Sequence, residues 1–141
     1  VLTAARSQTA DGKSVLYGKK TTALTWKLEH SAWLLTKFFA RFWDSSYYRT
    51  YSEKKADPYG YMGVEQEVTR SLARPEDFLG VEKGIDDFFA KDSGLYRDSE
   101  SNSKPAWVVE DGNYLSARWP GDAHTLGKRF VMSLNNHANK A

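Results

Sequence analysis

The sequence predicts a mixed α/β fold, and three stretches of the chain carry this prediction. Two short apolar runs, residues 107–109 and 114–116, flank an Asp-Gly-Asn turn. Asp-Gly and Gly-Asn pairs supply the positive φ angles of tight turns, so this pattern indicates a β-hairpin. Apolar residues at three- and four-residue steps predict one helix from Ala123 onward and another from Trp26 to about Phe42.

A loop and a helix follow the second predicted strand. The sequence Arg118-Trp119-Pro120-Gly121 ends the strand, because proline cannot donate to a β-ladder. Asp122 is a favourable N-cap for the helix, whose apolar stripe consists of Ala123, Leu126, Gly127, Phe130, Val131 and Leu134. Open α/β sheets bind ligands between strand ends and a helix N-terminus, so this loop is a candidate substrate-binding site. Its candidate residues are Arg118, Trp119, Asp122 and His124. The competing interpretation is a structural hairpin with a closing helix.

Composition limits the chemistry of the chain. It has 141 residues, a formal net charge of +2 and no cysteine. Its own residues therefore provide no disulfide, no thiolate metal site and no cysteine nucleophile. The three histidines, His30, His124 and His137, have no metal-ligand spacing, so we expect surface or packing roles for them and no metal site. His124 alone stays open, because it lies in the first turn after the loop.

Two stretches resemble one protein family. Residues 108–124 (VVEDGNYLSARWPGDAH) resemble the closing segment of the ThiJ/PfpI family, which belongs to the class I glutamine-amidotransferase-like superfold. Residues 11–25 (DGKSVLYGKKTTALT) resemble the family's passage of glycine-bearing turns and short strands that precedes a helix. The resemblance covers both ends of the chain, about half of its residues, and the middle diverges.

The resemblance implies an α/β fold that is part of a three-layer helix/sheet/helix, flavodoxin-like sandwich with a mostly parallel sheet and a short β-hairpin. Residues 14–17 and 20–25 would be strands. Residues 1–141 would form the C-terminal half of a single domain, with residues 44–105 as a divergent, aromatic-rich insertion. Residues 1–6 look like the end of the helix that follows the catalytic cysteine in this family. The nucleophile would then lie on an N-terminal half outside this sequence.

The resemblance also implies a function. The chain would be part of a cysteine-dependent hydrolase or lyase without a cofactor, acting on small carbonyl compounds, glycated or damaged proteins, or peptides. Glu29 falls where some relatives place the glutamate of a Cys-His-Glu triad, which orients the histidine. The competing interpretation of Glu29 is structural, because the helix dipole favours a carboxylate in the first turn of any helix.

The aromatic segments leave several partners open. The helix from Trp26 could lie on a membrane surface, but we expect it to pack against the sheet or a partner subunit. Tyrosines and basic residues at 47–61 could stack on nucleic acid, or could form a subunit interface or a packed loop. We expect a homo-oligomer in the cytoplasm, without nucleic-acid or membrane binding. The alternative function is a non-catalytic interaction or dimerisation domain of the same fold, which uses residues 33–61.

Overall fold

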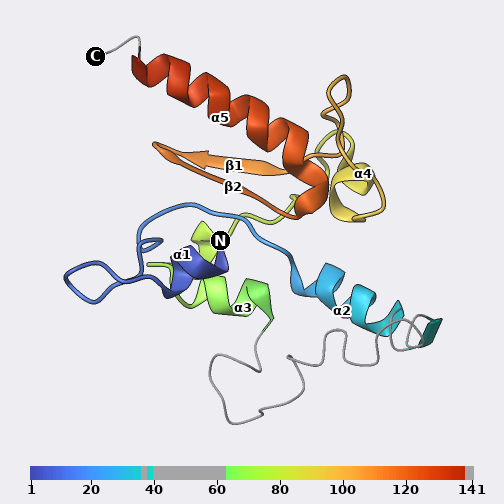
Figure 1. The fold of residues 1–141 in the computed structure, drawn as a ribbon. Helices are drawn as coiled ribbons and strands as arrows, with labels where there is room; N and C mark the ends of the chain where they lie inside the picture. Colours follow the sequence, from blue (N-terminus) through green and yellow to red (C-terminus); the bar gives the residue numbers. More distant parts are fainter. Residues whose placement is uncertain (36–37, 40–62, 139–141) are drawn as a thin grey trace.

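A computed structural model describes residues 1–35, 38–39 and 63–138 of the chain. These residues form five α-helices, two 3₁₀ turns and two β-strands, which Figure 1 shows in chain order. The helices are α1 (Leu2–Arg6), α2 (Trp26–Leu35), α3 (Val64–Thr69), α4 (Phe88–Asp92) and α5 (Ala123–Ala138); the 3₁₀ turns are η3 (Pro75–Asp77) and η4 (Pro120–Asp122). The strands are β1 (Val108–Asp111) and β2 (Tyr114–Ala117).

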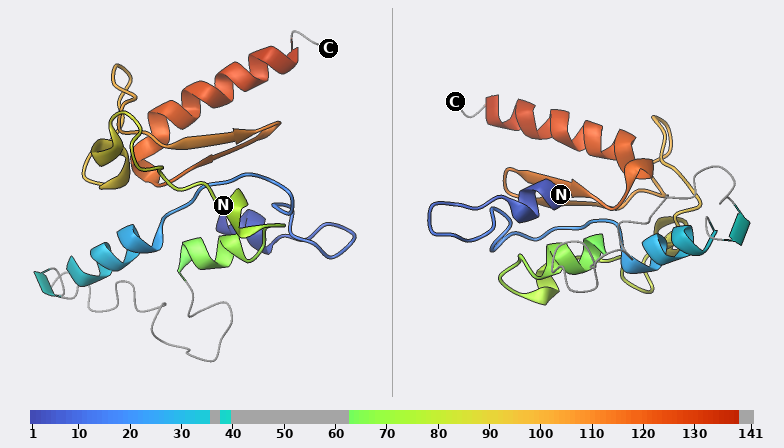
Figure 2. Two further views of the ribbon diagram at one scale, coloured as in Figure 1. Left: turned by 180° about the vertical axis from the view of Figure 1, so that it is seen from behind. Right: turned by 60° about the horizontal axis from the view of Figure 1, so that its bottom comes forward.

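The predicted hairpin is confirmed. Strands β1 and β2 pair antiparallel, with Val108 opposite Ala117 and Asp111 opposite Tyr114. Gly112 has a φ of 63°, the left-handed conformation that the turn requires and that glycine adopts without steric cost. Helix α5 lies across one face of this hairpin, and α1, α2 and α3 lie on the other side (Figures 1 and 2).

Residues 20–22 lie against the face of the hairpin that α5 does not cover. The Oγ of Ser116 accepts the N–H of Thr22 at 3.0 Å, and the hydroxyl groups of Tyr114 and Thr21 lie 2.9 Å apart. Thr21 also forms an isolated parallel bridge with Phe78. Residues 20–22 therefore connect the hairpin to the segment that follows α3.

A small apolar core lies between α1, α3 and these extended residues. Its buried members are Ala5, Leu16, Ala23, Val68 and Leu72. An ion pair closes its edge: Nη2 of Arg6 donates to both carboxylate oxygens of Glu67, at 2.9 and 2.8 Å. Since two of the five core side chains are alanine, the described part of the chain buries little apolar surface.

The predicted three-layer, flavodoxin-like sandwich is wrong. In the described ranges the structure has a single two-stranded antiparallel sheet, with neither a parallel sheet nor three layers. Residues 14–19 form consecutive turns rather than a strand, because Tyr17 N–H bonds to the Ser14 carbonyl and Lys19 N–H to the Leu16 carbonyl. Residues 20–25 are extended only in part, and one bridge at Thr21 does not make a ladder.

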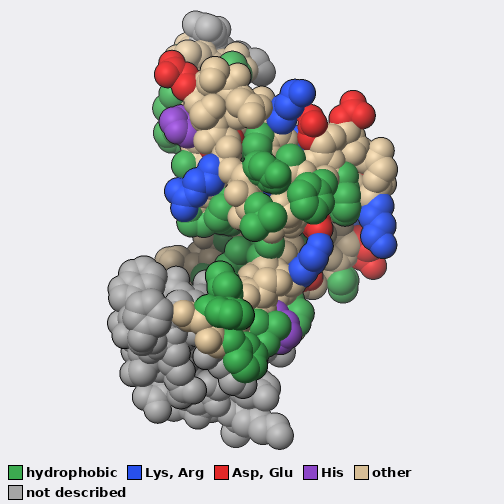
Figure 3. All heavy atoms as spheres, turned by 90° about the vertical axis from the view of Figure 1, so that its right-hand side faces the viewer, with side chains coloured by type: hydrophobic (Ala, Val, Ile, Leu, Met, Phe, Trp, Pro, Cys, Tyr) green, Lys and Arg blue, Asp and Glu red, His purple; other side chains and the backbone are tan. Residues whose placement is uncertain are grey.

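Many apolar side chains are exposed, and Figure 3 shows several on one face of the molecule. On α5, the side chains of Phe130, Val131, Met132 and Leu134 are each more than half exposed. Leu35, at the end of α2, is 60% exposed, and Phe38 and Phe39 are also exposed. The helix predicted from Trp26 was expected to pack on a sheet or on a partner subunit. Its side chains at positions 35, 38 and 39 do not pack on a sheet in the described part of the chain, and packing on a partner subunit stays a prediction. The predicted tyrosine-rich interface at 47–61 lies outside the described residues.

Candidate functional site

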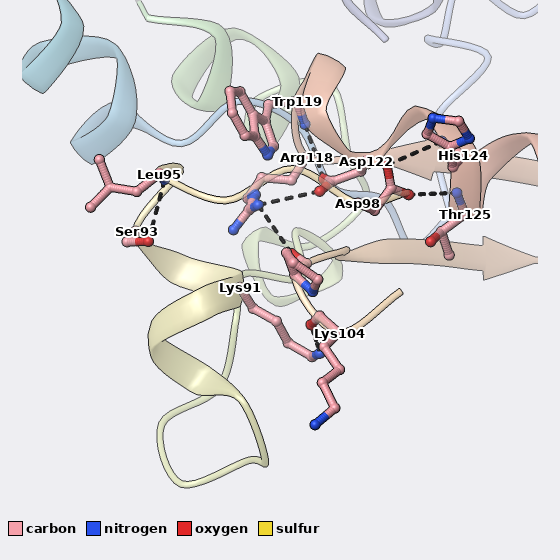
Figure 4. Close-up of polar contacts among 11 residues, drawn as sticks. Lys91, Ser93, Leu95, Asp98, Lys104, Arg118, Trp119, Asp122, His124 and Thr125 are labelled. Atoms are coloured by element: carbon pink, nitrogen blue, oxygen red, sulfur yellow. Dashed lines mark hydrogen bonds and ion pairs between the residues drawn. The ribbon is translucent and has the colours of Figure 1, made fainter. Parts of the chain in front are cut away.

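The predicted substrate-binding loop leads from the end of β2 through η4 into α5 (Figure 4). Arg118 and Asp122 are buried within it, with 2% and 0% of their surface exposed. Nη2 of Arg118 lies 3.2 Å from Oδ1 of Asp122 and also donates to the carbonyl of Pro105 at 3.4 Å. The structure thus brings together the two charged candidates of the loop as a buried ion pair.

Burial dominates the electrostatics of this pair. It lowers the pKa of the Arg118 guanidinium, and the opposite charge of Asp122 offsets this only in part. It raises the pKa of the Asp122 carboxyl in the same way, against the effect of Arg118. Nε and Nη1 of Arg118 have no acceptor in the described part of the chain. The pair is therefore costly to maintain, as is common for buried ion pairs.

Trp119 lies against the pair. Its ring centroid is 5.8 Å from the Arg118 guanidinium carbon and 5.5 Å from that of Arg97, so cations lie near the ring from two segments. The ring packs closely on Gly121: a Cβ at that glycine would lie 2.2 Å from a ring carbon. Glycine is thus the residue that lets the indole ring lie over the loop.

The predicted N-cap of α5 is wrong. Oδ2 of Asp122 turns back to accept the N–H of Trp119 at 3.3 Å, and α5 is preceded by the 3₁₀ turn η4. The cap comes from Asp98, whose carboxylate accepts the N–H groups of His124 at 3.2 Å and Thr125 at 2.5 Å. His124 is therefore held at its backbone, and its exposed side chain lies beside the Asp98 carboxylate (Figure 4).

Glu29 lies at a different junction, between α2 and α3. It is 3% exposed, and its Oε2 accepts the N–H of Val64, the first residue of α3, at 2.9 Å. In return, Oε2 of Glu65 accepts the N–H of Trp26, the first residue of α2, at 2.5 Å. Each helix therefore supplies the N-terminal acceptor of the other, an arrangement that we call the crossed caps.

Gly63 makes this junction possible. A Cβ at Gly63 would lie 2.7 Å from Oε2 of Glu29 and 2.9 Å from the ring of Trp26. That ring in turn stacks on His30, with a centroid distance of 5.4 Å. The junction is thus closely packed, and its carboxylate is held in place by surroundings that a larger residue at position 63 would disturb.

The sequence did not reveal Asp98, Glu65 or Gly63 as parts of these sites. Asp98 lies 26 residues before His124, whose backbone N–H it accepts, and Glu65 lies 39 residues after Trp26. Separations of this size leave no local signal in the sequence. Only the spacing of Gly63 and Gln66 gave a local signal, because the Gln66 side chain accepts the Gly63 N–H at 2.6 Å as in a capping box.

Neither a metal site nor a membrane span appears in the residues that the structure describes. In those ranges, no three or more histidine or acidic side chains are grouped so that they could hold a metal ion. None of the helices there has the length and apolar character needed to cross a bilayer.

No family model, curated protein or solved structure matches the chain. The resemblance to the ThiJ/PfpI family therefore stays a prediction that depends on residues 11–25 and 108–124.

Proposed function

We propose that the chain is the part of a ThiJ/PfpI-like, cysteine-dependent hydrolase or lyase that orients the catalytic histidine. The substrates are small carbonyl compounds, glycated or damaged proteins, or peptides. The chain has no cysteine, so the thiol of the proposed site would belong to sequence outside these 141 residues. The resemblance implies that its histidine follows that cysteine directly in the chain. The observation that carries the proposal is Glu29, a buried carboxylate held in one place by the Val64 N–H.

A carboxylate that orients an imidazole must itself be fixed. Glu29 meets this requirement, because the α3 N-terminus binds Oε2 and close contact with Gly63 limits its movement. In the proposed mechanism Glu29 accepts the histidine N–H, fixes the tautomer and stabilises the imidazolium. The histidine takes the thiol proton, and the thiolate attacks the carbonyl carbon of the substrate. Arg118, Trp119 and Asp122 shape the loop beside the substrate.

The crossed caps provide a matched control for this proposal. Glu29→Gln and Glu65→Gln each weaken one cap, so both variants should lower the free energy of unfolding by about 0.5–1.5 kcal/mol. In the complete, cysteine-containing protein, only Glu29→Gln should lower kcat for a 2-oxoaldehyde, by on the order of 10²-fold. It should also shift the pH profile of cysteine alkylation, which a purely structural role would leave unchanged. Equal turnover in the two variants would refute the role of Glu29.

A second candidate function is a non-catalytic interaction or dimerisation domain. The exposed apolar side chains of α5, Phe130, Val131, Met132 and Leu134, favour it, since contiguous exposed apolar surface often marks an interface. This function predicts that the chain associates alone. Light scattering after size exclusion should then show a dimer or larger species, and Phe130→Ser with Leu134→Ser should reduce it to the monomer. A wild-type monomer at all concentrations would exclude this function.

A further inference from the structure

The loop at Arg118 buries more hydrogen-bond donors than it pairs. The side chain of Arg118 is 1% exposed, and only its Nη2 has acceptors, which are Oδ1 of Asp122 and the carbonyl of Pro105. Its Nε and Nη1 are buried without an acceptor in the described part of the chain, and so is Nε1 of Trp119. In Figure 4 the indole nitrogen lies on the edge of the ring that faces the guanidinium. Buried polar groups are normally paired, so these three donors indicate a place for an acceptor group.

The carboxylates whose charges act on this loop are already engaged. Oδ1 of Asp122 pairs with Arg118, and its Oδ2 accepts the backbone N–H of Trp119. The carboxylate of Asp98 accepts two backbone N–H groups at the start of α5. Asp92 forms an ion pair with a lysine of α2. In the part of the chain that the structure describes, these three acids therefore leave the donors unpaired, and an acceptor from outside the chain can fill the place.

Positive charge favours an anionic acceptor. Burial destabilises the Arg118 guanidinium, and Asp122 offsets this only in part, so the pKa of Arg118 is lowered. Arg97, which is exposed, brings a second guanidinium to within 5.5 Å of the centroid of the Trp119 ring. Hydrogen bonds between a guanidinium and a carboxylate are roughly twice as strong as those between neutral groups. A carboxylate, with two acceptor oxygens, therefore suits this loop better than a neutral carbonyl group.

We propose that Arg118, Trp119 and Arg97 bind the carboxylate of a small organic acid. Nε and Nη1 of Arg118 and Nε1 of Trp119 donate to its two oxygens, and Arg97 approaches from the solvent side. The unpaired nitrogens have almost no exposed surface, whereas Trp119 is partly exposed, so the indole ring turns aside to admit the ligand. The proposed function places this loop beside the substrate, and on that function rests the further step that the acid is a substrate, a carbonyl compound with a carboxylate.

Calorimetric titration of the 141-residue chain with pyruvate tests the proposal. Pyruvamide is the matched ligand, because it has the same carbonyl group and a neutral amide in place of the carboxylate. We expect saturable binding of pyruvate, and binding of pyruvamide that is weaker by about tenfold or more.

Three variants locate the binding site. Trp119→Phe keeps an aromatic ring and removes the indole N–H, so it should weaken pyruvate binding by about fivefold. Arg97→Gln removes the exposed guanidinium and should weaken binding to a similar extent. Lys83→Gln is the matched control: it removes one positive charge from an exposed position on another segment, and it should bind pyruvate like the wild type. All three variants keep the buried Arg118–Asp122 pair, and circular dichroism checks that the fold is retained.

Three results would overturn the proposal. Without saturable pyruvate binding, water alone would serve the unpaired donors. Pyruvamide that binds as tightly as pyruvate would exclude recognition of the carboxylate, and equal affinities in Lys83→Gln, Trp119→Phe and Arg97→Gln would place the ligand elsewhere.

This test is separate from that of the proposed function, because the chain that is titrated has no cysteine. Pyruvate binding to the chain without carbonyl turnover by the complete protein would support the carboxylate site and refute the proposed function. Turnover by the complete protein without pyruvate binding would refute the carboxylate site alone.

Discussion

At the scale of single residues, the Arg118–Asp122 pair is unusual for its complete burial. A guanidinium and a carboxylate are both buried, and two of the guanidinium nitrogens have no acceptor in the described part of the molecule. Breaking such a pair by removing one partner costs on the order of 3–5 kcal/mol, because it leaves a buried charge alone. Replacing both partners by apolar residues is often neutral or stabilising.

Asp122→Asn should change how stability depends on pH. Burial raises the pKa of Asp122 above its ordinary value of 3.8, so the folded protein holds this proton more tightly than the unfolded chain. The contribution of the carboxyl to the free energy of unfolding is therefore present below 3.8 and is lost as the pH rises through the raised pKa. Urea denaturation at several pH values should show this loss in the wild type and not in the variant.

The control for this prediction is the double variant Arg118→Met with Asp122→Leu. Because it leaves neither charge buried, it should be at least as stable as Asp122→Asn at neutral pH. A double variant that is less stable than Asp122→Asn would show that the pair stabilises the loop.

At the scale of elements, helix termini are held by side chains from distant segments. Asp98 caps α5, and the crossed caps join α2 to α3. Short helices gain little from their own hydrogen bonds, so such external acceptors decide where they begin. The two junctions should therefore be sensitive to changes in residues outside the helices that they cap.

Asp98→Ala should destabilise α5 at its start. The variant loses the acceptor of two backbone N–H groups, at an expected cost of about 1–2 kcal/mol. Hydrogen exchange at His124 and Thr125 should become faster. Glu100→Ala, two residues further along the same loop, should leave these rates unchanged; similar acceleration in both variants would argue against the cap.

Gly63→Ala should lower the free energy of unfolding by about 1–3 kcal/mol through overpacking. Its φ of −64° suits alanine, so the loss must come from the displaced Glu29 and Trp26 side chains. Gly127→Ala is the opposite case, because nothing lies within 4 Å of the new Cβ in the interior of α5. It should stabilise the protein by about 0.5–1 kcal/mol. Urea denaturation distinguishes the two, and a neutral Gly63→Ala would contradict the close packing.

At the scale of the whole molecule, local chemistry was predictable from the sequence and long-range pairing was not. The Asp-Gly-Asn turn and the stripe of α5 depend on neighbouring residues, so the hairpin and the helix were predicted correctly. Residues 14–25 have the β-branched composition of strands, but a strand also needs a paired neighbour, and Thr21 finds only a single bridge. Asp122 has the residue type of an N-cap, yet the fold gives that role to Asp98.

The exposed apolar surface belongs to this scale as well. The buried core is small, whereas Phe130, Leu134 and other large side chains stay accessible. Under the proposed function, we expect the segment that carries the cysteine to cover part of this surface. The chain and that segment would then form one folding unit.

The proposed function requires a thiol outside these 141 residues. The most direct test is the intact mass of every polypeptide in the protein purified from its natural source, measured under denaturing conditions after thiol alkylation. The proposed function predicts an alkylated polypeptide, either one longer chain that contains this sequence or a second chain that purifies with it. A single unalkylated species of 16.0 kDa would contradict the proposed function.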